Sequence, residues 1–320
     1  MDLEERFEVV KRGSEEIVTE EGLKDLLKKD EFRVYCGYEP SGKLHFGHAL
    51  TVQKLIDLQE FGAEVVVLFA DLHAFLNDKG ELDEIRELAR YNKECFIGFG
   101  LDPDQTEFVL GSDFQLDSDY SMNVLQLATQ STLNRARRSM DMIARHLDNP
   151  DVAQVIYPLM QAVDMDWLGV DMAVGGIDQR KVHMIAREKL PSIGSEKPVF
   201  VHTPLLHGLD GSEKMSSTKR NFIALDDSPE KIREKVNGAF CPEKEIKNNP
   251  IFEYVVQFIF PRIQKLSIER PEKYGGSIEL NSLEELRKVY LSGELHPADL
   301  KKAVAEALID MLEPVRNHLE

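Results

Sequence analysis

The sequence predicts an α/β protein with a doubly wound parallel sheet, a helical insertion and a mostly α-helical C-terminal domain. Over the first two thirds of the 320 residues, short runs of β-forming residues alternate with longer helix-like segments. This alternation is typical of a parallel sheet with helices on both faces. A long helical stretch over about 116–162 interrupts it. We interpret that stretch as an insertion between two halves of the sheet.

Each expected strand is a short run rich in residues that favour extended backbone. The expected strands are Phe32–Gly37, Glu64–Ala70, Thr106–Leu110, Val170–Val174 and Val199–Thr203. The segments between them are longer and rich in helix formers. The expected helices are Glu21–Lys29, Ala49–Phe61, Leu82–Phe99, Tyr120–Arg145, Asp151–Gln161 and Arg180–Glu188.

The composition changes near residues 226–230, and the chain reads as mostly helical beyond them. Ser228 followed by Pro229 is a good helix start, because serine caps the helix and proline fits its first turn. We therefore predict a first domain of residues 1–225 and a helical domain of residues 226–320.

The formal net charge of −18 argues against a nucleic acid as a general partner. Local basic patches can still bind one, and the best patch is Arg135, Arg137 and Arg138. The plainer interpretation of that patch is a solvated helix face. The three cysteines are too widely spaced for a zinc knuckle or a redox pair, so we predict no protein-bound metal.

The chain shows no pattern of a membrane segment or a secretion signal. Its longest apolar stretch, Val65–Leu72, is interrupted by Asp71 and is far shorter than a bilayer span. The N-terminal residues are acidic and lack the pattern of a signal peptide. We therefore expect a cytoplasmic protein.

Two histidines lie where a predicted strand turns into a predicted helix. His45 and His48 are separated by Phe46 and Gly47. At such a turn, backbone N–H groups and the helix dipole favour an anion such as a phosphate. An imidazole can donate a hydrogen bond to a phosphate oxygen, and the glycine leaves room for a nucleotide ring. The alternative is a pair of surface or capping histidines.

The same segment is a near miss to the phosphate loop of P-loop nucleotidases. Gly37, Gly42 and Lys43 have the right spacing, but Leu44 stands where that motif needs serine or threonine for Mg²⁺. Pro40 also removes a backbone donor from the loop. We therefore reject the P-loop interpretation.

A second candidate motif lies much further along the chain. Lys214, Ser216 and Ser217 follow the glycine-bearing segment 208–211. A lysine on a mobile loop can close over a triphosphate and neutralise the leaving pyrophosphate, and neighbouring hydroxyls add donors. This pattern is weak alone. In this order with the two histidines, it indicates a nucleotide-using enzyme.

The pair of motifs resembles the two signature sequences of class I aminoacyl-tRNA synthetases, which have a Rossmann-type sheet. Segments 39–45, 157–164, 175–181 and 296–301 look like those of tyrosyl-tRNA synthetases of the archaeal and eukaryotic type. The resemblance covers nearly the whole chain. It implies an ATP-binding ligase of protein biosynthesis, which converts L-tyrosine and ATP, accompanied by Mg²⁺, to tyrosyl-adenylate and then charges tRNA-Tyr.

The resemblance implies a tyrosine pocket. Tyr35 and Asp164 would hold the phenol hydroxyl, and an unpaired buried carboxylate would reject phenylalanine strongly. Tyr157, Gln161 and Gln179 would hold the ammonium and carboxyl end of the substrate. The alternatives are that Tyr35 belongs to the core and that Asp164 lies at a solvated helix end.

The resemblance also implies a nucleotide site. Its expected residues are Gly47 and Asp178 at the nucleoside and His45, His48, Lys214, Ser216 and Ser217 at the phosphates. Asp178 could also cap the helix that follows it. Ser217 stands where most class I members carry a second lysine, as it does in archaeal-type enzymes, and Lys219 could compensate. His73 could line the pocket or be a satisfied core histidine.

For tRNA, the resemblance implies two sets of contacts and assigns residues 226–320 to anticodon binding. The residues expected at the acceptor stem are Arg135, Arg137, Arg138, Arg180 and Lys181. Those expected to read a guanine of the anticodon, by stacking and by accepting from the base edge, are Tyr274, His296 and Asp299. Asp299 could instead cap a helix after Pro297.

The family works as a homodimer, and the insertion would supply the interface. Apolar residues of the insertion could form it or face the protomer's own core: Leu125, Leu127, Ala128, Leu133 and Met140. Three alternative functions stay open from the sequence: a tryptophanyl-tRNA synthetase, a small-molecule nucleotidyltransferase or adenylate-forming ligase, and an RNA-binding relative without activity.

Overall fold

The computed structural model places most of the chain. It describes residues 1–143, 151–215, 219 and 221–320.

Contacts divide the chain into two compact units. The first unit is Met1–Gly42 with Thr51–Pro204, and the second is Lys43–Leu50 with Leu205–Glu320. Residues 205–225, which the sequence assigned to the first domain, thus group with the C-terminal part. The assignment of a catalytic and an anticodon-binding domain stays a prediction.

The first unit contains, within its described residues, a six-stranded sheet with the order β1-β6-β5-β2-β3-β4. The strands are β1 (Glu16–Val18), β2 (Phe32–Tyr38), β3 (Ala63–Phe69), β4 (Thr106–Leu110), β5 (Met172–Gly176) and β6 (Val199–Thr203). β1 pairs antiparallel with β6, and the other pairs are parallel. The order reverses between β2 and β5, where such sheets bind ligands at the carboxyl ends of the strands. The predicted doubly wound sheet is confirmed.

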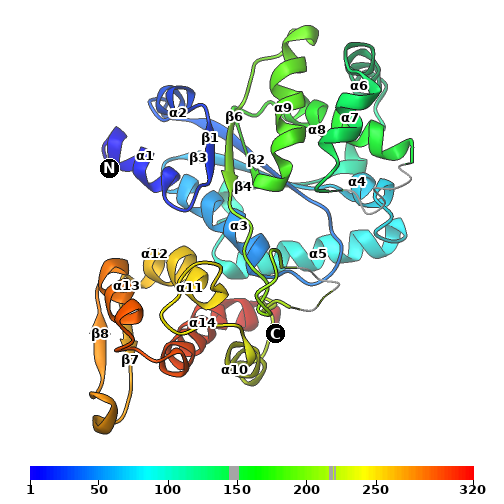
Figure 1. Ribbon diagram of the computed structural model, residues 1–320. Coiled ribbons are helices and arrows are strands. Elements are labelled where there is room, and N and C mark those ends of the chain that lie inside the picture. Colours follow the sequence, from blue (N-terminus) through cyan, green and yellow to red (C-terminus); the bar gives the residue numbers. More distant parts are fainter. Residues whose placement is uncertain (144–150, 216–218, 220) are drawn as a thin grey trace. The chain divides into compact units, whose positions relative to one another are not determined.

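Helices lie on both sides of this sheet (Figure 1). They are α1 (Leu3–Lys11), α2 (Glu20–Leu26), α3 (Phe46–Gln59), α4 (Asp71–Leu76), α5 (Leu82–Phe99), α6 (Ser118–Gln130), α7 (Leu133–Ser139), α8 (Ala153–Trp167) and α9 (Arg180–Lys189). α3 begins in the second unit and continues in the first.

The strand register decides which helices cover which face. The rings of Tyr38 on β2 and Phe69 on β3 both lie against Phe96 of α5, with centroid distances of 4.7 and 6.1 Å. Because side chains alternate along a strand, Tyr35 points to the opposite face. There it packs in the same buried cluster as Val163 of α8 and parts of α9. α5 therefore covers one face, and α8 and α9 cover the other.

The predicted helix over residues 120–145 is wrong as a single helix. α6 ends at Gln130, and Thr132 begins α7 by accepting a hydrogen bond from the backbone N of Arg135 at 3.2 Å. A threonine that caps a helix start has extended backbone, so a continuous helix cannot pass through it. The last two residues of the predicted helix, 144 and 145, lie outside the described residues.

α8 is longer than predicted, and this changes the surroundings of Asp164. The helix passes through Pro158 and continues beyond residue 161 to Trp167. Asp164 therefore lies inside the helix and is buried rather than at a solvated end. Tyr157, Gln161 and Asp164 are spaced by four and three residues, so they share one face of α8.

The second unit is mostly helical. Its helices are α10 (Pro229–Gly238), α11 (Pro250–Tyr254), α12 (Phe260–Ile263), α13 (Leu283–Ser292) and α14 (Pro297–Leu319). Ser228 caps α10 ahead of Pro229, as predicted. A short antiparallel hairpin of β7 (Leu266–Ile268) and β8 (Ile278–Leu280) was not predicted. None of the helices in the part of the chain that the structure describes is long and apolar enough to cross a membrane.

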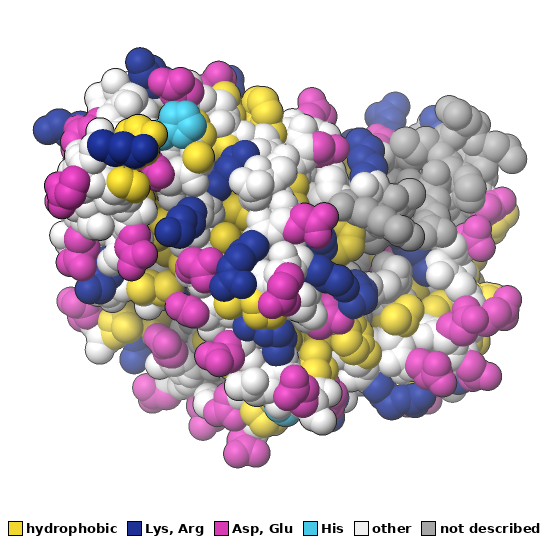
Figure 2. All heavy atoms as spheres, turned by 90° about the horizontal axis from the view of Figure 1, so that it is seen from below, with side chains coloured by type: hydrophobic (Ala, Val, Ile, Leu, Met, Phe, Trp, Pro, Cys, Tyr) yellow, Lys and Arg dark blue, Asp and Glu magenta, His cyan; other side chains and the backbone are white. Residues whose placement is uncertain are grey.

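Acidic and basic side chains are interspersed over the face shown in Figure 2. On this face neither sign gathers into one large area, although the net charge is −18. On this face, the binding of a polyanion would depend on small groups of basic side chains.

Lys54 of α3 ties the end of α1 to the rest of the first unit. Its side chain is almost fully buried, and its ammonium donates to the backbone carbonyls of Val9 (3.1 Å), Val10 (2.9 Å) and Arg12 (2.6 Å). These are carbonyls at the end of a helix, which have no partner inside the helix. Burial lowers the pKa of Lys54 to about 8. The hydrogen bonds offset the cost of burying the charge.

We expect Lys54→Met to lower the free energy of unfolding by about 2–4 kcal/mol, because three carbonyls at the end of α1, one of them buried and two partly buried, lose a charged donor. Lys28→Met is the control, since Lys28 is exposed and pairs only at the surface with Asp25. The control should cost less than about 1 kcal/mol. Urea unfolding of the three proteins measures the difference, and equal effects of the two variants would contradict the role given to Lys54.

Candidate active site

The carboxylate of Asp164 lies at the base of a buried polar cluster in the first unit. Its Oδ1 accepts hydrogen bonds from Gln115 Nε2 and from the hydroxyl of Tyr120, both at 2.7 Å. Its Oδ2 is buried and has no hydrogen-bond partner among the described residues. Burial raises the pKa of Asp164 to about 7, although both hydrogen bonds favour the charged form. The protein thus uses one oxygen and leaves the other to a ligand.

Tyr35 lies on β2 within electrostatic reach of Asp164. Burial is the main cause that raises the pKa of Tyr35, and the charge of Asp164 adds to it. A Cβ at position 37 would lie 2.4 Å from the Tyr35 hydroxyl oxygen, so Gly37 leaves the space that this hydroxyl occupies. The structure therefore brings Tyr35 and Asp164 to the same place, and Tyr35 also belongs to the core.

His73 of α4 lies beside the same carboxylate. Its Nε2 is 3.7 Å from Asp164 Oδ2, and its Nδ1 is 3.2 Å from Gln115 Nε2. The Gln115 amide must turn its NH₂ group to the Asp164 carboxylate, so it donates to Nδ1 and leaves the proton of the neutral ring on Nε2. Burial lowers the pKa of His73 to about 4. His73 is therefore a neutral member of the cluster.

The remaining residues predicted for tyrosine lie on α8 and after β5. The hydroxyl of Tyr157 donates to Glu39 Oε1 at 2.6 Å, and its ring meets that of His73 edge-on with centroids 4.5 Å apart. Gln161 Nε2 donates to Gln179 Oε1 at 3.2 Å. Of the residues predicted for tyrosine, Tyr35 thus lies in the middle of β2, Gln179 follows the carboxyl end of β5, and the other three lie on the face of α8 that carries Asp164.

Asp178 lies in the 3₁₀ turn Ile177–Gln179 that connects β5 to α9. Gln179 occupies the N-cap position of α9, so Asp178 does not cap that helix at the position considered from the sequence. The turn follows the carboxyl end of β5, next to the reversal in strand order. This place suits a residue that holds a ligand.

Three buried oxygens of this cluster have no hydrogen-bond partner among the described residues. They are Asp164 Oδ2, Gln115 Oε1 and Gln161 Oε1. Buried polar atoms without partners are few in folded proteins, and each costs free energy. The protonated Nε2 of His73 likewise has no hydrogen-bond partner among the described residues and lies 3.7 Å from Asp164 Oδ2. The cluster therefore suits a ligand with a hydroxyl group, which can donate to the carboxylate and accept from this N–H, and with a further donor such as an ammonium.

Gln115 and Tyr120, the two protein donors to Asp164, were not predicted from the sequence. Gln115 follows β4 after a short turn, and Tyr120 lies in the first turn of α6. The only signal for Gln115 was its place just beyond the carboxyl end of a predicted strand. Glu39 accepts hydrogen bonds from the hydroxyl of Tyr157 and from Asn77 Nδ2 at 3.1 Å. The sequence indicated it only as part of the motif over residues 39–45.

The two motif histidines lie in the second unit, at the start of α3. His45 Nδ1 accepts from the backbone N of Gly47 at 3.1 Å, and the rings of His45 and His48 are 4.1 Å apart. Burial, followed by the charges of His48 and Lys214, lowers the pKa of His45 to about 2. His45 is therefore neutral. Its ring also lies 4.9 Å from that of Phe222.

Gly47 has a local structural reason in addition to the predicted one. A Cβ at position 47 would lie 2.8 Å from Cε1 of His45. The imidazole can fold over the helix start only because glycine stands there. The room for a nucleotide ring beside Gly47 stays a prediction.

The loop that carries Lys214 is held by hydrogen bonds within the second unit. Asn221 Nδ2 donates to Asp210 Oδ1 at 3.0 Å and to Ser212 Oγ at 2.8 Å. The backbone N of Met215 donates to the carbonyl of Leu206 at 3.0 Å. Ser216 and Ser217, predicted at the phosphates, lie outside the described residues.

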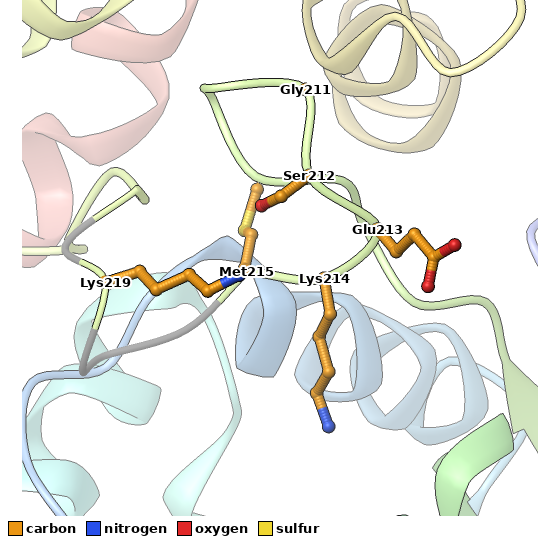
Figure 3. A pocket seen from close by; sticks show the side chains of 6 residues that line it. All are labelled: Gly211, Ser212, Glu213, Lys214, Met215 and Lys219. Carbon is orange, nitrogen blue, oxygen red and sulfur yellow. The ribbon is translucent and has the colours of Figure 1, made fainter.

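A cavity of about 640 Å³ adjoins this loop. It is lined by Gly211, Ser212, Glu213, Lys214, Met215 and Lys219 (Figure 3). In Figure 3 the side chain of Lys219 extends toward Met215, whereas that of Lys214 extends away from the loop. The two lysines thus present their ammonium groups in different directions.

Comparison with known proteins adds to this geometry. The sequence model of a family described as tRNA synthetases class I (W and Y) matches residues 27–313. A curated tyrosine–tRNA ligase from Methanopyrus kandleri is 57% identical over 317 residues, which are 99% of this chain and 98% of that protein. The chain belongs to the archaeal-type tyrosyl-tRNA synthetases of class I.

Solved structures agree with this family. The crystal structure of a tyrosyl-tRNA synthetase from Archaeoglobus fulgidus, complexed with L-tyrosine, has a TM-score of 0.97 and 52% identity, with all of both chains covered. One from Pyrococcus horikoshii, also complexed with L-tyrosine, has a TM-score of 0.91 and 36% identity, and the match covers 100% of this chain and 96% of that one. The likeness extends over the whole chain, so this is a tyrosyl rather than a tryptophanyl member of the class.

Three of the five basic residues predicted at the acceptor stem form ion pairs with carboxylates of the first unit. Arg135 Nη2 lies 2.8 Å from Glu188, and Arg180 Nε lies 2.7 Å from Glu16. Lys181 Nζ similarly lies 2.8 Å from a carboxylate oxygen of Asp141. A tRNA phosphate would have to compete with these carboxylates.

Arg137 and Arg138 of α7, the rest of the basic patch, are exposed. Their helix also carries the buried Ala136 and Ser139, so the two arginines occupy its outer face. Because Arg137 and Arg138 are exposed, they can attract a polyanion before Arg135 leaves its carboxylate partner. Their role toward tRNA stays a prediction.

The three predicted anticodon residues lie in the second unit. Tyr274 is 60% exposed in a 3₁₀ turn, so its ring is accessible for stacking. His296, not Asp299, caps α14: its Nδ1 accepts from the backbone N of Ala298 at 3.1 Å. The interpretation of Asp299 as the cap is therefore wrong, and its carboxylate lies in the first turn of the helix.

The residues considered for a dimer interface divide into two groups. Leu127 and Met140 are buried in the protomer's own core. Leu125 and Leu133 are 60% and 67% exposed, and Ala128 is also exposed. Within the described residues, no group of three or more His, Cys, Asp or Glu side chains is placed to hold a metal ion.

We expect the stability of the ligand-free protein to depend on the protonation of Asp164. Burial raises its pKa from 3.8 to about 7, so the folded form holds this proton more tightly than the unfolded form. The stability that the proton contributes is complete below pH 3.8 and is lost as the pH rises to about 7. Asp164→Asn keeps an acceptor for Gln115 and Tyr120 but does not titrate.

The free energy of unfolding of Asp164→Asn, relative to wild type, should therefore increase from pH 4 to pH 7. Urea unfolding over this range measures it. Asp166→Asn, at a half-buried position on the same helix, is the matched control for the amide substitution. A constant difference for Asp164→Asn would contradict the burial argument.

Proposed function

We propose that the chain charges tRNA-Tyr with L-tyrosine in two steps at the sites described above. In the first step, the tyrosine carboxylate attacks the α-phosphorus of ATP, a P–O bond to the α-phosphate forms, and pyrophosphate leaves. In the second, the terminal ribose hydroxyl of the tRNA attacks the acyl carbon and AMP leaves. The full-length likeness to tyrosine–tRNA ligases at 57% identity supports this function.

The single observation that carries the choice of tyrosine is the unused oxygen of Asp164. A phenol hydroxyl that donates to Oδ2 would satisfy it, and Tyr35 lies within reach to take part. Phenylalanine has no such donor and would leave the buried oxygen unpaired. A site of this kind can reject the analogue without the hydroxyl by about 10⁴–10⁵-fold.

We assign the other end of tyrosine to Tyr157, Gln161 and Gln179. The unpaired Gln161 Oε1 is a suitable acceptor for the substrate ammonium, and its Nε2 is already fixed by Gln179. Tyr157 is oriented by its hydrogen bond to Glu39, whose negative charge also attracts the ammonium. Asp178, after β5, would accept from the ribose hydroxyls of ATP.

The phosphates of ATP, which arrives with Mg²⁺ as substrate, are assigned to the second unit. Neutral His45 can donate a hydrogen bond to a phosphate oxygen without bringing a charge, and His48 lies against it. Lys214, together with Ser216 and Ser217 from the sequence motif, would neutralise the charge that develops on the leaving pyrophosphate. No step needs a dedicated general acid or base, since positioning and charge stabilisation suffice.

For tRNA, we propose that the acceptor stem displaces the carboxylates that now hold Arg135, Arg180 and Lys181. Phosphate offers arginine a bidentate partner of the same kind as a carboxylate, so the exchange costs little. Tyr274 would stack on an anticodon base, with Asp299 accepting from a base edge.

We also propose that the protein is a homodimer through the insertion. Large apolar side chains are exposed on α6, α7 and the segments beside them: Leu116 (75%), Met122 (54%), Leu125 (60%), Leu133 (67%) and Val152 (76%). A soluble monomer rarely leaves so many on one insertion. A second copy of this chain would cover them.

Pyrophosphate exchange tests the function and the pocket together. Wild type should exchange pyrophosphate into ATP with tyrosine and with none of the other nineteen amino acids at comparable efficiency. Asp164→Ala should lower the ratio of kcat/KM for tyrosine to that for phenylalanine by at least about a hundredfold, because the hydroxyl loses its acceptor. Wild-type selectivity in this variant would reassign Asp164, and exchange driven by another amino acid would overturn the function.

The two lysines of the loop are a matched pair for the phosphate site. Lys214→Ala should lower the rate of tyrosyl-adenylate formation by at least about a hundredfold and leave the tyrosine Kd nearly unchanged. Lys219→Ala should lower this rate much less. An equal loss of rate in Lys219→Ala would show that Lys219 supplies the charge that a second motif lysine provides in most class I members. Single-turnover kinetics separates the two steps. A Lys214→Ala defect confined to tyrosine binding would contradict its assignment.

A further inference from the structure

His73 and Gln115 are two neutral side chains beside Asp164. The segments that carry them both contact a second carboxylate, that of Asp71. Asp71 is fully buried and is the first residue of α4, the helix that carries His73. Its Oδ1 accepts from the backbone N of Ser112 at 2.8 Å. Ser112 belongs to the 3₁₀ turn Gly111–Asp113, which leads to Gln115. One carboxylate therefore joins the helix of His73 to the turn before Gln115.

Both oxygens of Asp71 have partners. Oδ1 also accepts from the backbone N of Leu72 at 3.0 Å, and Arg86 Nε of α5 lies 3.2 Å from Oδ2. A carboxylate held from three directions by a helix start, a turn and a guanidinium has a fixed rotamer. A carboxylate in a fixed rotamer restricts the positions of the residues that are hydrogen-bonded to it.

The turn also determines where the Gln115 amide lies. The backbone N of Gln115 donates to the carbonyl of Gly111 at 2.9 Å. A Cβ at position 111 would lie 2.5 Å from Gln115 Oε1 and 3.0 Å from Asp71 Oδ1. Glycine is needed here for space, because the Gln115 amide and the Asp71 carboxylate both approach the Cα atom of Gly111.

We propose that Asp71 is a positioning residue for the selection of tyrosine. By holding the turn at Gly111–Asp113 against α4, it directs Gln115 and His73 to Asp164, so that Oδ1 of Asp164 is occupied and Oδ2 is left to the substrate hydroxyl. Asp71 does not touch the substrate. The inference rests on the proposed function and names a further determinant of its specificity.

The test compares Asp71→Ala with wild type in pyrophosphate exchange. The ratio of kcat/KM for tyrosine to that for phenylalanine should fall at least tenfold, with a raised KM for tyrosine and an unchanged KM for ATP. Asp83→Asn is the control, because Asp83 is fully exposed and approaches the same Arg86 at 3.8 Å. It should leave the ratio unchanged. A merely structural role of Asp71 would lower the melting temperature and the active fraction but not the ratio.

Gly111→Ala provides an independent variant in case Asp71→Ala does not fold. The added methyl group must displace the Gln115 amide and crowds the Asp71 carboxylate, so the same ratio should fall. Wild-type selectivity in a folded Asp71→Ala protein, or in Gly111→Ala when the first variant is unfolded, overturns the inference. A wild-type protein that shows no preference for tyrosine in pyrophosphate exchange would instead overturn the proposed function.

Discussion

The pocket depends on the unequal use of the two oxygens of a buried carboxylate. Asp164 accepts from Gln115 and Tyr120 through Oδ1, and its Oδ2 has no hydrogen-bond partner among the described residues. Two donors on one oxygen fix the orientation of the group before any substrate arrives. The remaining oxygen then faces a defined direction. In the proposed function, its lack of a partner would make a hydroxyl group on the substrate a requirement for tight binding. Folding buries this oxygen without a hydrogen bond at a cost in free energy, and a substrate hydroxyl that binds to it would offset that cost.

The sheet explains why these groups meet. Tyr35 and Tyr38 are three residues apart on the same strand, so they face opposite sides of the sheet. One side packs against α5, and the other packs against α8, which carries Asp164. The reversal of strand order between β2 and β5 places Tyr35 and the turn at Asp178 on adjacent strands. The proposed selection of tyrosine would therefore follow from the strand topology as well as from side-chain chemistry.

The sequence predicted the elements with strong periodicity and failed where single hydrogen bonds decide. Leu82–Phe99 has the predicted bounds, because its apolar stripe is continuous and a glycine follows it. The break before α7 was missed because one threonine hydroxyl on a backbone N–H outweighs helix propensity over several residues. The edge strand β1 was missed because three residues carry too little pattern.

Among the candidate site residues of the two units, the motifs led to those with recognisable spacing, such as His45 and Asp164. Gln115 and Asp71 gave no such signal. Their positions are set by a turn whose geometry depends on contacts between segments far apart in the chain. A motif indicates which side chains carry the chemistry, but the groups that hold them in place become visible only when the tertiary contacts are known.

The placement of Tyr157, Gln161 and Asp164 on a single helix limits how this architecture can diverge. Inserting or deleting one residue between them would rotate the later part of α8 by about 100° relative to the earlier part and move its members away from one another. Connections at the strand ends tolerate changes of length far better. Descendants of this scaffold with a different amino acid should therefore differ by replacements along α8 at constant length, and the gain or loss of residues should be confined to the connecting segments.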